Sequence, residues 1–202
     1  MTFYSANVFS RNSKTPNNII KIEITPLLIN WYSREKRNLP WRITRNPYAI
    51  WLSEIILQQT RVKQGTPYYE KFIKTYPTVQ ALAAASEQEV LKLWEGLGYY
   101  SRARNLHQAA RQISREHGGI FPNSYIELLK LRGIGPYTAA AIASICFHEK
   151  VPAVDGNVFR LISRLFGIHK DISKASTRKI FEKTIFTLKN LTLFKYFNGI
   201  KR

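Results

Sequence analysis

The chain has 202 residues, of which 45% are hydrophobic, and this composition supports a folded core and excludes an intrinsically disordered protein. Its 31 Lys and Arg against 13 Asp and Glu give a net charge of +18, which favours nucleic acid as a partner; a basic surface kept for solubility is the alternative. One cysteine, Cys146, excludes an internal disulfide framework, and no apolar run reaches the roughly 20 residues of a membrane span, so we expect a cytoplasmic protein.

The N-terminal part of the chain divides into an arm and a first helix. Residues 1–20 are polar and rich in Ser and Asn, and we expect a flexible arm there. Thr25-Pro26 predicts the start of a helix with an apolar stripe on one side. The charged run 34–38 is expected to end it.

The next helix is predicted to begin at Asn46-Pro47 and to run to about Gln58. Its apolar side chains cover nearly the whole circumference of a helix, which is typical of a buried helix. Glu54 falls in the narrow polar gap that remains. Because an unpaired carboxylate is costly to bury, Glu54 is either paired with a nearby arginine or kept for chemistry.

Further helices follow without a convincing strand or repeat between them. Thr66-Pro67 is expected to open one helix, and 78–85 forms a short one. Ser86 and Glu89 have the spacing of a capping box before the next helix. A long helix is predicted from about residue 99 to 117. The chain is therefore expected to be all-α.

The segment 131–140, Leu-Arg-Gly-Ile-Gly-Pro-Tyr-Thr-Ala-Ala, has the composition of a tight reversal between two helices. A short helix that opens at Asn123-Ser124 is expected to end at Arg132-Gly133. Gly133 and Gly135 are expected to take the positive φ angles of the turn, and the proline that follows them suits the first turn of the second helix. Backbone N–H groups at such a helix start can bind a phosphate, although an ordinary helix–helix turn is the alternative.

Two more helices are predicted near the C-terminus. The segment Val-Asp-Gly-Asn-Val at 154–158 starts a helix that reaches Phe166, and the last clear helix spans about 174–188. Asp155 is either a plain helix cap or a carboxylate that the N–H groups of the helix start hold for chemistry.

The segments 131–140 and 154–158 resemble the helix-hairpin-helix motif and the following loop of the endonuclease III superfamily of DNA glycosylases. From about Leu39 to Phe166 the chain is similar to the A/G-mismatch-specific adenine DNA glycosylases within it. Three further blocks stand in the same order as in that family: Pro-Trp-Arg at 40–42, the segment 51–60 and the segment 96–106.

The resemblance implies an all-α helix-hairpin-helix glycosylase fold made of two lobes. A six-helix barrel lobe would span 42–150, with the hairpin at 124–147, and 21–41 together with 151–188 would form the second lobe. The active site would lie in the cleft between the lobes. The expected partner is double-stranded DNA with an A:8-oxoguanine or A:G mismatch, bound by a monomer in the nucleoid of a bacterial cell.

Releasing adenine breaks a C–N bond to a poor leaving group, so protonation of the base and stabilisation of positive charge on the sugar both help. A carboxylic acid that burial keeps protonated can protonate the base, and this role suits Glu54. An ionised carboxylate can stabilise the positive charge on the sugar, and this role suits Asp155. The resemblance implies the same roles, with Glu54 also handling a catalytic water. It further implies that Asn157 supports the sugar and that water, and that Tyr137 packs near the sugar and Asp155.

Tyr137 also distinguishes two subclasses of the superfamily. Members that cleave the strand as well carry a lysine at this position, because that reaction proceeds through an imine. A tyrosine cannot form one, so we expect base removal without an efficient lyase step.

The target base must leave the stack before it can react. By resemblance, Gln59 and Tyr99 would wedge into the duplex. Arg102 and Arg104 could contact phosphates or simply be solvated. The residues expected to bind DNA are Gln59, Tyr99, Arg102, Gly133, Gly135 and Thr138. Those expected to wall the adenine pocket are Arg37, Leu39 and Trp41. For each aromatic residue, core packing is the alternative.

The chain departs from the family after the last predicted helix. Family members carry four cysteines there for a [4Fe-4S] cluster, followed by a domain that recognises 8-oxoguanine. Cys146 alone cannot bind such a cluster, so no metal site is expected. We interpret 189–202 as the aberrant tail of a C-terminally truncated chain, with an incomplete second lobe and impaired activity. A non-catalytic DNA-binding fragment is the alternative function, against which Glu54 on a buried helix argues.

Overall fold

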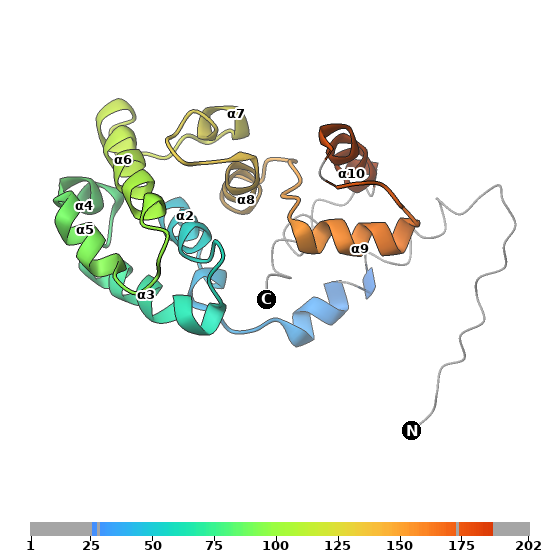
Figure 1. Ribbon diagram of the computed structural model, residues 1–202, viewed down its shortest axis with the longest axis horizontal. Helices are drawn as coiled ribbons and strands as arrows, with labels where there is room; N and C mark the ends of the chain where they lie inside the picture. Colours follow the sequence, from blue (N-terminus) through green and yellow to red (C-terminus); the bar gives the residue numbers. More distant parts are fainter. Residues whose placement is uncertain (1–25, 28, 173, 188–202) are drawn as a thin grey trace, which may run out of the picture.

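The structure is a computed structural model that describes residues 26–27, 29–172 and 174–187 (Figure 1). All regular elements in this part of the chain are helical, which confirms the all-α prediction. The predicted arm at 1–20 and tail at 189–202 lie outside the described residues. After helical residues at 26–27 and 29–35, the elements are η1 (Pro40–Arg42), α2 (Pro47–Ile56), α3 (Val62–Thr75), α4 (Val79–Ala84), α5 (Glu87–Trp94), α6 (Ser101–Glu116), α7 (Tyr125–Leu128), α8 (Pro136–Cys146), α9 (Gly156–Phe166) and α10 (Ala175–Thr187).

Helix α2 is the central element of the larger core. Asn46 caps its N-terminus by accepting hydrogen bonds from the backbone N–H groups of Tyr48 at 2.9 Å and Ala49 at 3.3 Å. Every residue of α2 after Pro47 is buried, as the apolar circumference predicts. The helix packs against η1, α3, α6 and α8, so it is covered on several sides.

Helix α3 begins earlier than predicted. The sequence places its start at Thr66-Pro67, but the helix runs from Val62 and contains Pro67. The proline removes one helical hydrogen bond, yet burial on both sides of it holds the helix together. Gly65, before the proline, and Tyr69 and Phe72, after it, are all buried on the same helix.

The helices α4, α5 and α6 complete the larger core, with α6 packed against α2, α4 and α5. The predicted capping box of α5 is confirmed: the Glu89 N–H donates to the Ser86 hydroxyl at 3.2 Å, and the Ser86 N–H donates to the Glu89 carboxylate at 2.8 Å. Phe72 and Trp94 meet edge to face in this core, with ring centroids 5.8 Å apart.

The hairpin joins α7 to α8, which pack on each other. Helix α7 ends at Leu128, before the predicted end, and turns lead from there to Gly133. Gly133 has φ +71°, and a Cβ there would lie 2.6 Å from the Cβ of Asn105, so only glycine fits. The positive φ predicted for Gly135 is wrong: its φ is −86°, because it is the extended N-cap residue that precedes Pro136.

Helices α9 and α10 form a second, smaller core around Val158, Ile162 and Phe181. Phe159 packs edge to face on Phe181, with ring centroids 4.8 Å apart. In Figure 1 this pair lies on the right, and α8 lies between it and the helices α2 to α6. Within the described ranges, no helix combines the length and apolar character that crossing a membrane requires.

Candidate active site

Three of the predicted catalytic residues come together from three helices. Glu54 lies in α2, Tyr137 in the first turn of α8, and Asp155 is the N-cap residue of α9. The Tyr137 phenol hydrogen-bonds the Glu54 side chain. Burial first, and then the charges of Glu54 and Asp155, raise the pKa of Tyr137 well above its ordinary value of 10. Tyr137 is therefore hydrogen-bonded to one of the two carboxylates that the sequence singles out and feels the charge of the other.

Glu54 is buried, with only 6% of its surface exposed. It occupies the buried helix that the sequence predicts, and its carboxyl group has a tyrosine hydroxyl as a partner. A carboxyl group with this partner on a buried helix has little freedom to reorient. Its position is thus fixed before any substrate binds.

Asp155 is held by the start of α9. One carboxylate oxygen accepts hydrogen bonds from the backbone N–H groups of Asn157 and Val158, both at 2.9 Å. The other accepts from the Asn157 side-chain amide at 3.2 Å. The amide oxygen of Asn157 in turn accepts a hydrogen bond from Arg160. The carboxylate also lies at the positive end of the α9 helix dipole, with which a negative charge interacts favourably.

Asp155 and Asn157 open onto a cavity of about 310 Å³. The rest of its lining comes from the segment between α2 and α3 and from the first residue of α3: Leu57, Gln59, Thr60, Arg61 and Val62. Arg61 and Thr60 were not predicted as site residues. In the sequence, only their position directly after Gln59 indicates that Thr60 and Arg61 belong to the site. The neighbouring residues do not distinguish them from the start of an ordinary helix.

Gln59 and Tyr99 share an uncommon backbone conformation. Their φ angles are +58° and +49°, in the left-handed region that residues other than glycine rarely adopt. Tyr99 is 67% exposed, which rules out core packing for its side chain. Both residues thus present their side chains from strained positions on the surface.

The hairpin residues differ in what they offer a ligand. Nothing lies within 4 Å of the position that a Cβ on Gly135 would take, so the backbone at the start of α8 is open to close approach. Gly133 instead lies against the side chain of Asn105. The side chain of Thr138 is buried, with 3% exposed, so the predicted DNA contact of Thr138 is not supported for its hydroxyl.

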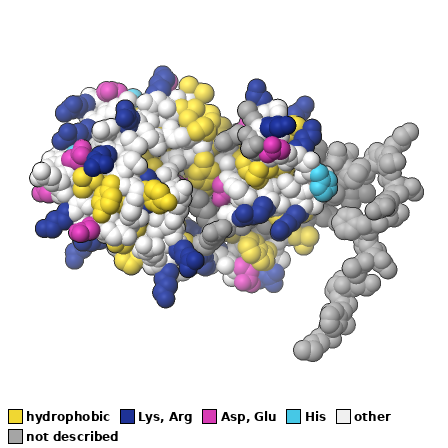
Figure 2. Space-filling view, viewed as in Figure 1, with side chains coloured by type: hydrophobic (Ala, Val, Ile, Leu, Met, Phe, Trp, Pro, Cys, Tyr) yellow, Lys and Arg dark blue, Asp and Glu magenta, His cyan; other side chains and the backbone are white. Residues whose placement is uncertain are grey.

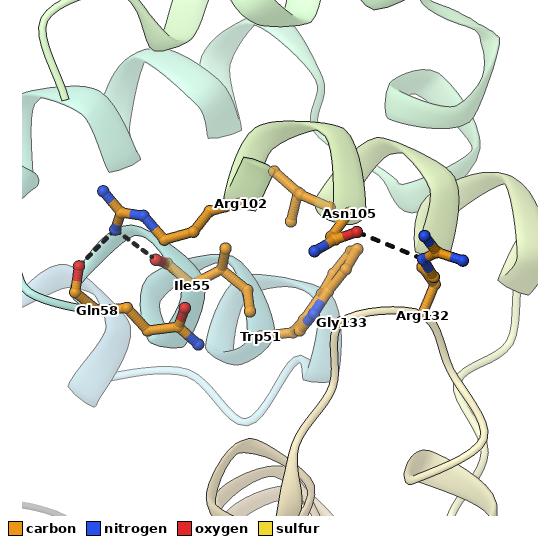
Figure 3. A pocket seen from close by; sticks show the side chains of 8 residues that line it. Trp51, Ile55, Gln58, Arg102, Asn105, Arg132 and Gly133 are labelled. Atoms are coloured by element: carbon orange, nitrogen blue, oxygen red, sulfur yellow. Dashed lines mark hydrogen bonds between the residues drawn. The ribbon is translucent and has the colours of Figure 1, made fainter. Parts of the chain in front are cut away.

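Arg102 is only partly exposed, and its predicted phosphate contact stays a prediction. Its guanidinium turns inward and donates to backbone carbonyls, including those of Ile55 and Gln58 (Figure 3). Beside it lies a small cavity of about 30 Å³ that reaches the hairpin at Gly133.

The predicted walls of the adenine pocket do not line the cavity beside Asp155, and their role stays a prediction. Trp41 is buried in the larger core, where its ring lies 5.1 Å from that of Tyr69 in an edge-to-face contact. Leu39 packs partly against the same core, and Arg37 is exposed. None of the three predicted wall residues lines the 310 Å³ cavity. For Trp41, core packing is what the structure shows.

The residues of this chain do not fit a [4Fe-4S] cluster. Such a cluster takes four cysteine ligands, and the sequence has one cysteine. Burial raises the pKa of the Cys146 thiol to about 12, which makes it a poor ligand and nucleophile. Among the described residues, no three His, Cys, Asp or Glu side chains gather as a metal site would require.

Comparisons with known proteins show the family to which the chain belongs. Residues 52–185 match the model of the HhH-GPD superfamily of base excision DNA repair proteins. Adenine DNA glycosylase of Buchnera aphidicola subsp. Baizongia pistaciae is 45% identical over 159 residues, which cover 78% of this chain and 45% of that protein. The human adenine DNA glycosylase is 46% identical over 155 residues, or 72% of this chain and 28% of that protein. The chain thus spans less than half the length of these curated relatives. The solved structure of a thermostable thymine-DNA glycosylase superposes with a TM-score of 0.79 at 28% identity, covering 90% of this chain and 84% of the other.

Proposed function

The chain belongs to the HhH-GPD superfamily of base excision DNA repair proteins, and from that premise we propose that it is an adenine DNA glycosylase. The proposed reaction is hydrolysis of the N-glycosidic bond of adenine mispaired with 8-oxoguanine or guanine. Two things support this choice: the names of relatives at 45% and 46% identity, and the link that Tyr137 makes between Glu54 and Asp155.

In the proposed mechanism, Glu54 supplies the proton that the departing adenine takes up, and it then positions the attacking water. Asp155 stabilises the positive charge that develops on the sugar as the C–N bond lengthens. Stabilisation of this kind acts mainly in the transition state, so it raises the rate rather than the affinity. Asn157, bonded to Asp155 at the cavity wall, contacts the sugar and the water.

Tyr137 has a supporting role in this mechanism. Its raised pKa keeps the phenol neutral, so it acts as a hydrogen-bond donor that orients Glu54. A phenol has no amine with which to form an imine, and the proposed enzyme is therefore monofunctional: it removes the base and leaves the strand intact.

The proposed partner is duplex DNA, which a net charge of +18 favours. Figure 2 shows Lys and Arg side chains spread over the visible face, with few Asp and Glu between them. The exposed Gln59 and Tyr99 would enter the stack where the adenine leaves it, and the open backbone at Gly135 would meet a phosphate. One chain carries all of these residues, so we propose that it acts as a monomer, in the cytoplasm on the bacterial nucleoid.

The observation that carries the proposal is the Glu54–Tyr137–Asp155 arrangement. The test is base release from a duplex with one adenine opposite 8-oxoguanine, read as strand cleavage after alkali. Matched duplexes with adenine opposite guanine or thymine measure the mismatch preference. Cleavage without alkali would contradict the monofunctional mechanism. Tight mismatch binding without any release would instead support the non-catalytic alternative.

A further inference from the structure

Among the described residues, three other than glycine have φ in the left-handed region: Gln59, Tyr99 and His148. This conformation is unfavourable for L-residues, and it persists only where the surrounding structure holds it. Gln59 lies just after the end of α2, whereas Tyr99 lies just before α6. The two exposed residues of the proposed DNA surface therefore need something that holds both loops.

One side of Arg102 holds the loop of Gln59. The Nη1 group of Arg102 donates to the carbonyls of Ile55 and Ile56, each at 3.1 Å, and to the carbonyl of Gln58 (Figure 3). The last carbonyls of a helix have no partner within it and form the negative end of its dipole. Helix α2 has no basic residue in its last turn, so Arg102 supplies the missing cation from another helix.

The other side of Arg102 holds the loop of Tyr99. The Nη2 group donates to the carbonyls of Leu97 and Gly98, both at 3.3 Å. The guanidinium carbon lies 5.1 Å from the ring centroid of Trp94 and 5.7 Å from that of Tyr99, so it is also packed between aromatic faces. A planar group with donors on two edges can bridge two loops in this way.

The acceptors on each side include the carbonyl immediately before a strained residue. The Gln58 carbonyl belongs to the peptide unit that leads into Gln59, and the Gly98 carbonyl to the one that leads into Tyr99. The torsion φ of a residue is the rotation about the N–Cα bond that follows this peptide unit. One guanidinium thus contacts both peptide units that lead into the two positive φ angles, and at Gly98 it shares the carbonyl with the Trp94 indole N–H, which donates at 3.0 Å.

We infer that Arg102 is a positioning residue, which fixes Gln59 and Tyr99 in the conformations that direct their side chains into the duplex. The inference rests on the proposed function, in which the side chains of Gln59 and Tyr99 enter the duplex. A positioning role for Arg102 differs from a phosphate contact in one testable way. A lysine can replace a charge that meets a phosphate, but it cannot bridge two loops.

The first test measures the loops without DNA. Amide hydrogen exchange is followed in 57–60 and 97–100 for the full chain and for Arg102→Lys and Arg102→Met. Arg104→Gln is the control, because Arg104 lies on the same helix in an exposed pair with Glu87 at 3.3 Å. Both Arg102 variants should speed exchange in both loops, by roughly tenfold for the loss of a charged hydrogen bond, with circular dichroism unchanged. Unchanged exchange, or a change in one loop alone, would overturn the inference.

The second test measures the wedge itself. In a Glu54→Gln background, which prevents turnover, the chain is added to a duplex with adenine opposite 8-oxoguanine and 2-aminopurine beside the adenine. The parent should raise 2-aminopurine fluorescence. Both Arg102 variants should lose most of this rise, while their affinity for undamaged duplex and its salt dependence stay the same.

The outcomes of the second test separate the two proposals. If Arg102→Met lowers affinity for undamaged duplex and reduces the salt slope by about 0.9, and Arg102→Lys restores both, Arg102 is a phosphate contact and the inference is overturned. If the parent gives no fluorescence rise, the wedge role within the proposed function is refuted. Loop exchange then still decides whether Arg102 holds the two loops.

Discussion

The phenol of Tyr137 donates a hydrogen bond to the carboxyl group of Glu54, which joins the first turn of α8 to the buried helix α2. Because its pKa is raised well above 10, the phenol stays a neutral donor at the pH values at which DNA is repaired. At the start of α8, the backbone of Gly135 in the hairpin is also open to close approach by a ligand. The position of the proposed general acid is thereby coupled to the element that is proposed to hold the DNA backbone.

We expect Glu54→Gln to abolish base release and to leave duplex binding intact. Loss of a general acid typically lowers a rate by ~10²–10⁴-fold. The amide oxygen of glutamine can still accept the hydrogen bond of Tyr137, so the fold should survive. Single-turnover release and fluorescence anisotropy measure the two effects. Glu127→Gln, in an exposed pair with Lys130, is the control and should release base normally. A Glu54→Gln rate near that of the unsubstituted chain would refute the assignment.

For Asp155→Asn, the expected result is a rate lower by ~10²–10³-fold with little change in stability. Asparagine caps a helix about as well as aspartate, so the free energy of unfolding should fall by less than about 1 kcal/mol. The rate falls because the negative charge that stabilises the sugar is lost. Asp155→Ala is the comparison, since it loses the cap as well and should melt at a lower temperature. An unfolded Asp155→Asn chain would make Asp155 structural.

Local signals in the sequence were sufficient for much of the fold. The buried helix α2 follows from apolar residues all round it, and the caps at Ser86 and Asp155 follow from short-range hydrogen bonds between neighbours. Each of these features depends on residues within a few positions of one another, so a single sequence contains the information.

Features that depend on distant partners were not predictable in the same way. Arg102 turns inward because carbonyls at Ile55 and Leu97 converge on it, and nothing near Arg102 in sequence indicates this. Helix α3 passes through Pro67 because burial of the helix outweighs one lost hydrogen bond. The positive φ predicted from the hairpin glycines was right for Gly133 and wrong for Gly135, and packing against Asn105, which the local sequence does not reveal, separates their roles.

Gly133→Ala and Gly135→Ala should have opposite effects. At Gly133, a positive φ and a Cβ only 2.6 Å from that of Asn105 make alanine destabilising, by about 1–3 kcal/mol. At Gly135, φ is −86° and space is open, so stability should hold or rise slightly, whereas duplex affinity should fall because a methyl group blocks the approach of a phosphate. Urea denaturation and anisotropy measure the pair. Equal stability of the two variants would contradict this account.

Binding to undamaged duplex should be mainly electrostatic, given the net charge of +18. Each phosphate that the protein neutralises releases counterions and adds about −0.9 to the slope of log affinity against log salt concentration. Anisotropy titrations over a series of salt concentrations should therefore give a steep negative slope. A flat response would show that the positive charge is not used on DNA.

The last prediction concerns acid stability and His107, which is 1% exposed in the larger core and lies 2.9 Å from the Ala85 carbonyl through Nε2. Burial first, and then the charge of Arg111, lower its pKa from the ordinary value of 6.5. In the unfolded chain the imidazole takes up a proton as the pH falls below 6.5, whereas in the folded chain it stays neutral to a lower pH. Its contribution to stability is therefore present above pH 6.5 and is lost as the pH falls, by at most about 1.4 kcal/mol per pH unit.

His107→Gln tests this, because glutamine can donate to the Ala85 carbonyl but cannot be protonated. Urea denaturation from about pH 7.5 to about pH 5 should show a shallower loss of stability for His107→Gln than for the unsubstituted chain. The exposed His169→Gln is the matched control and should keep the original slope. If the free energy of unfolding of His107→Gln instead falls with pH as steeply as that of the unsubstituted chain, the prediction is wrong. The loss of stability in acid would then come from groups that both chains share, such as the carboxylates.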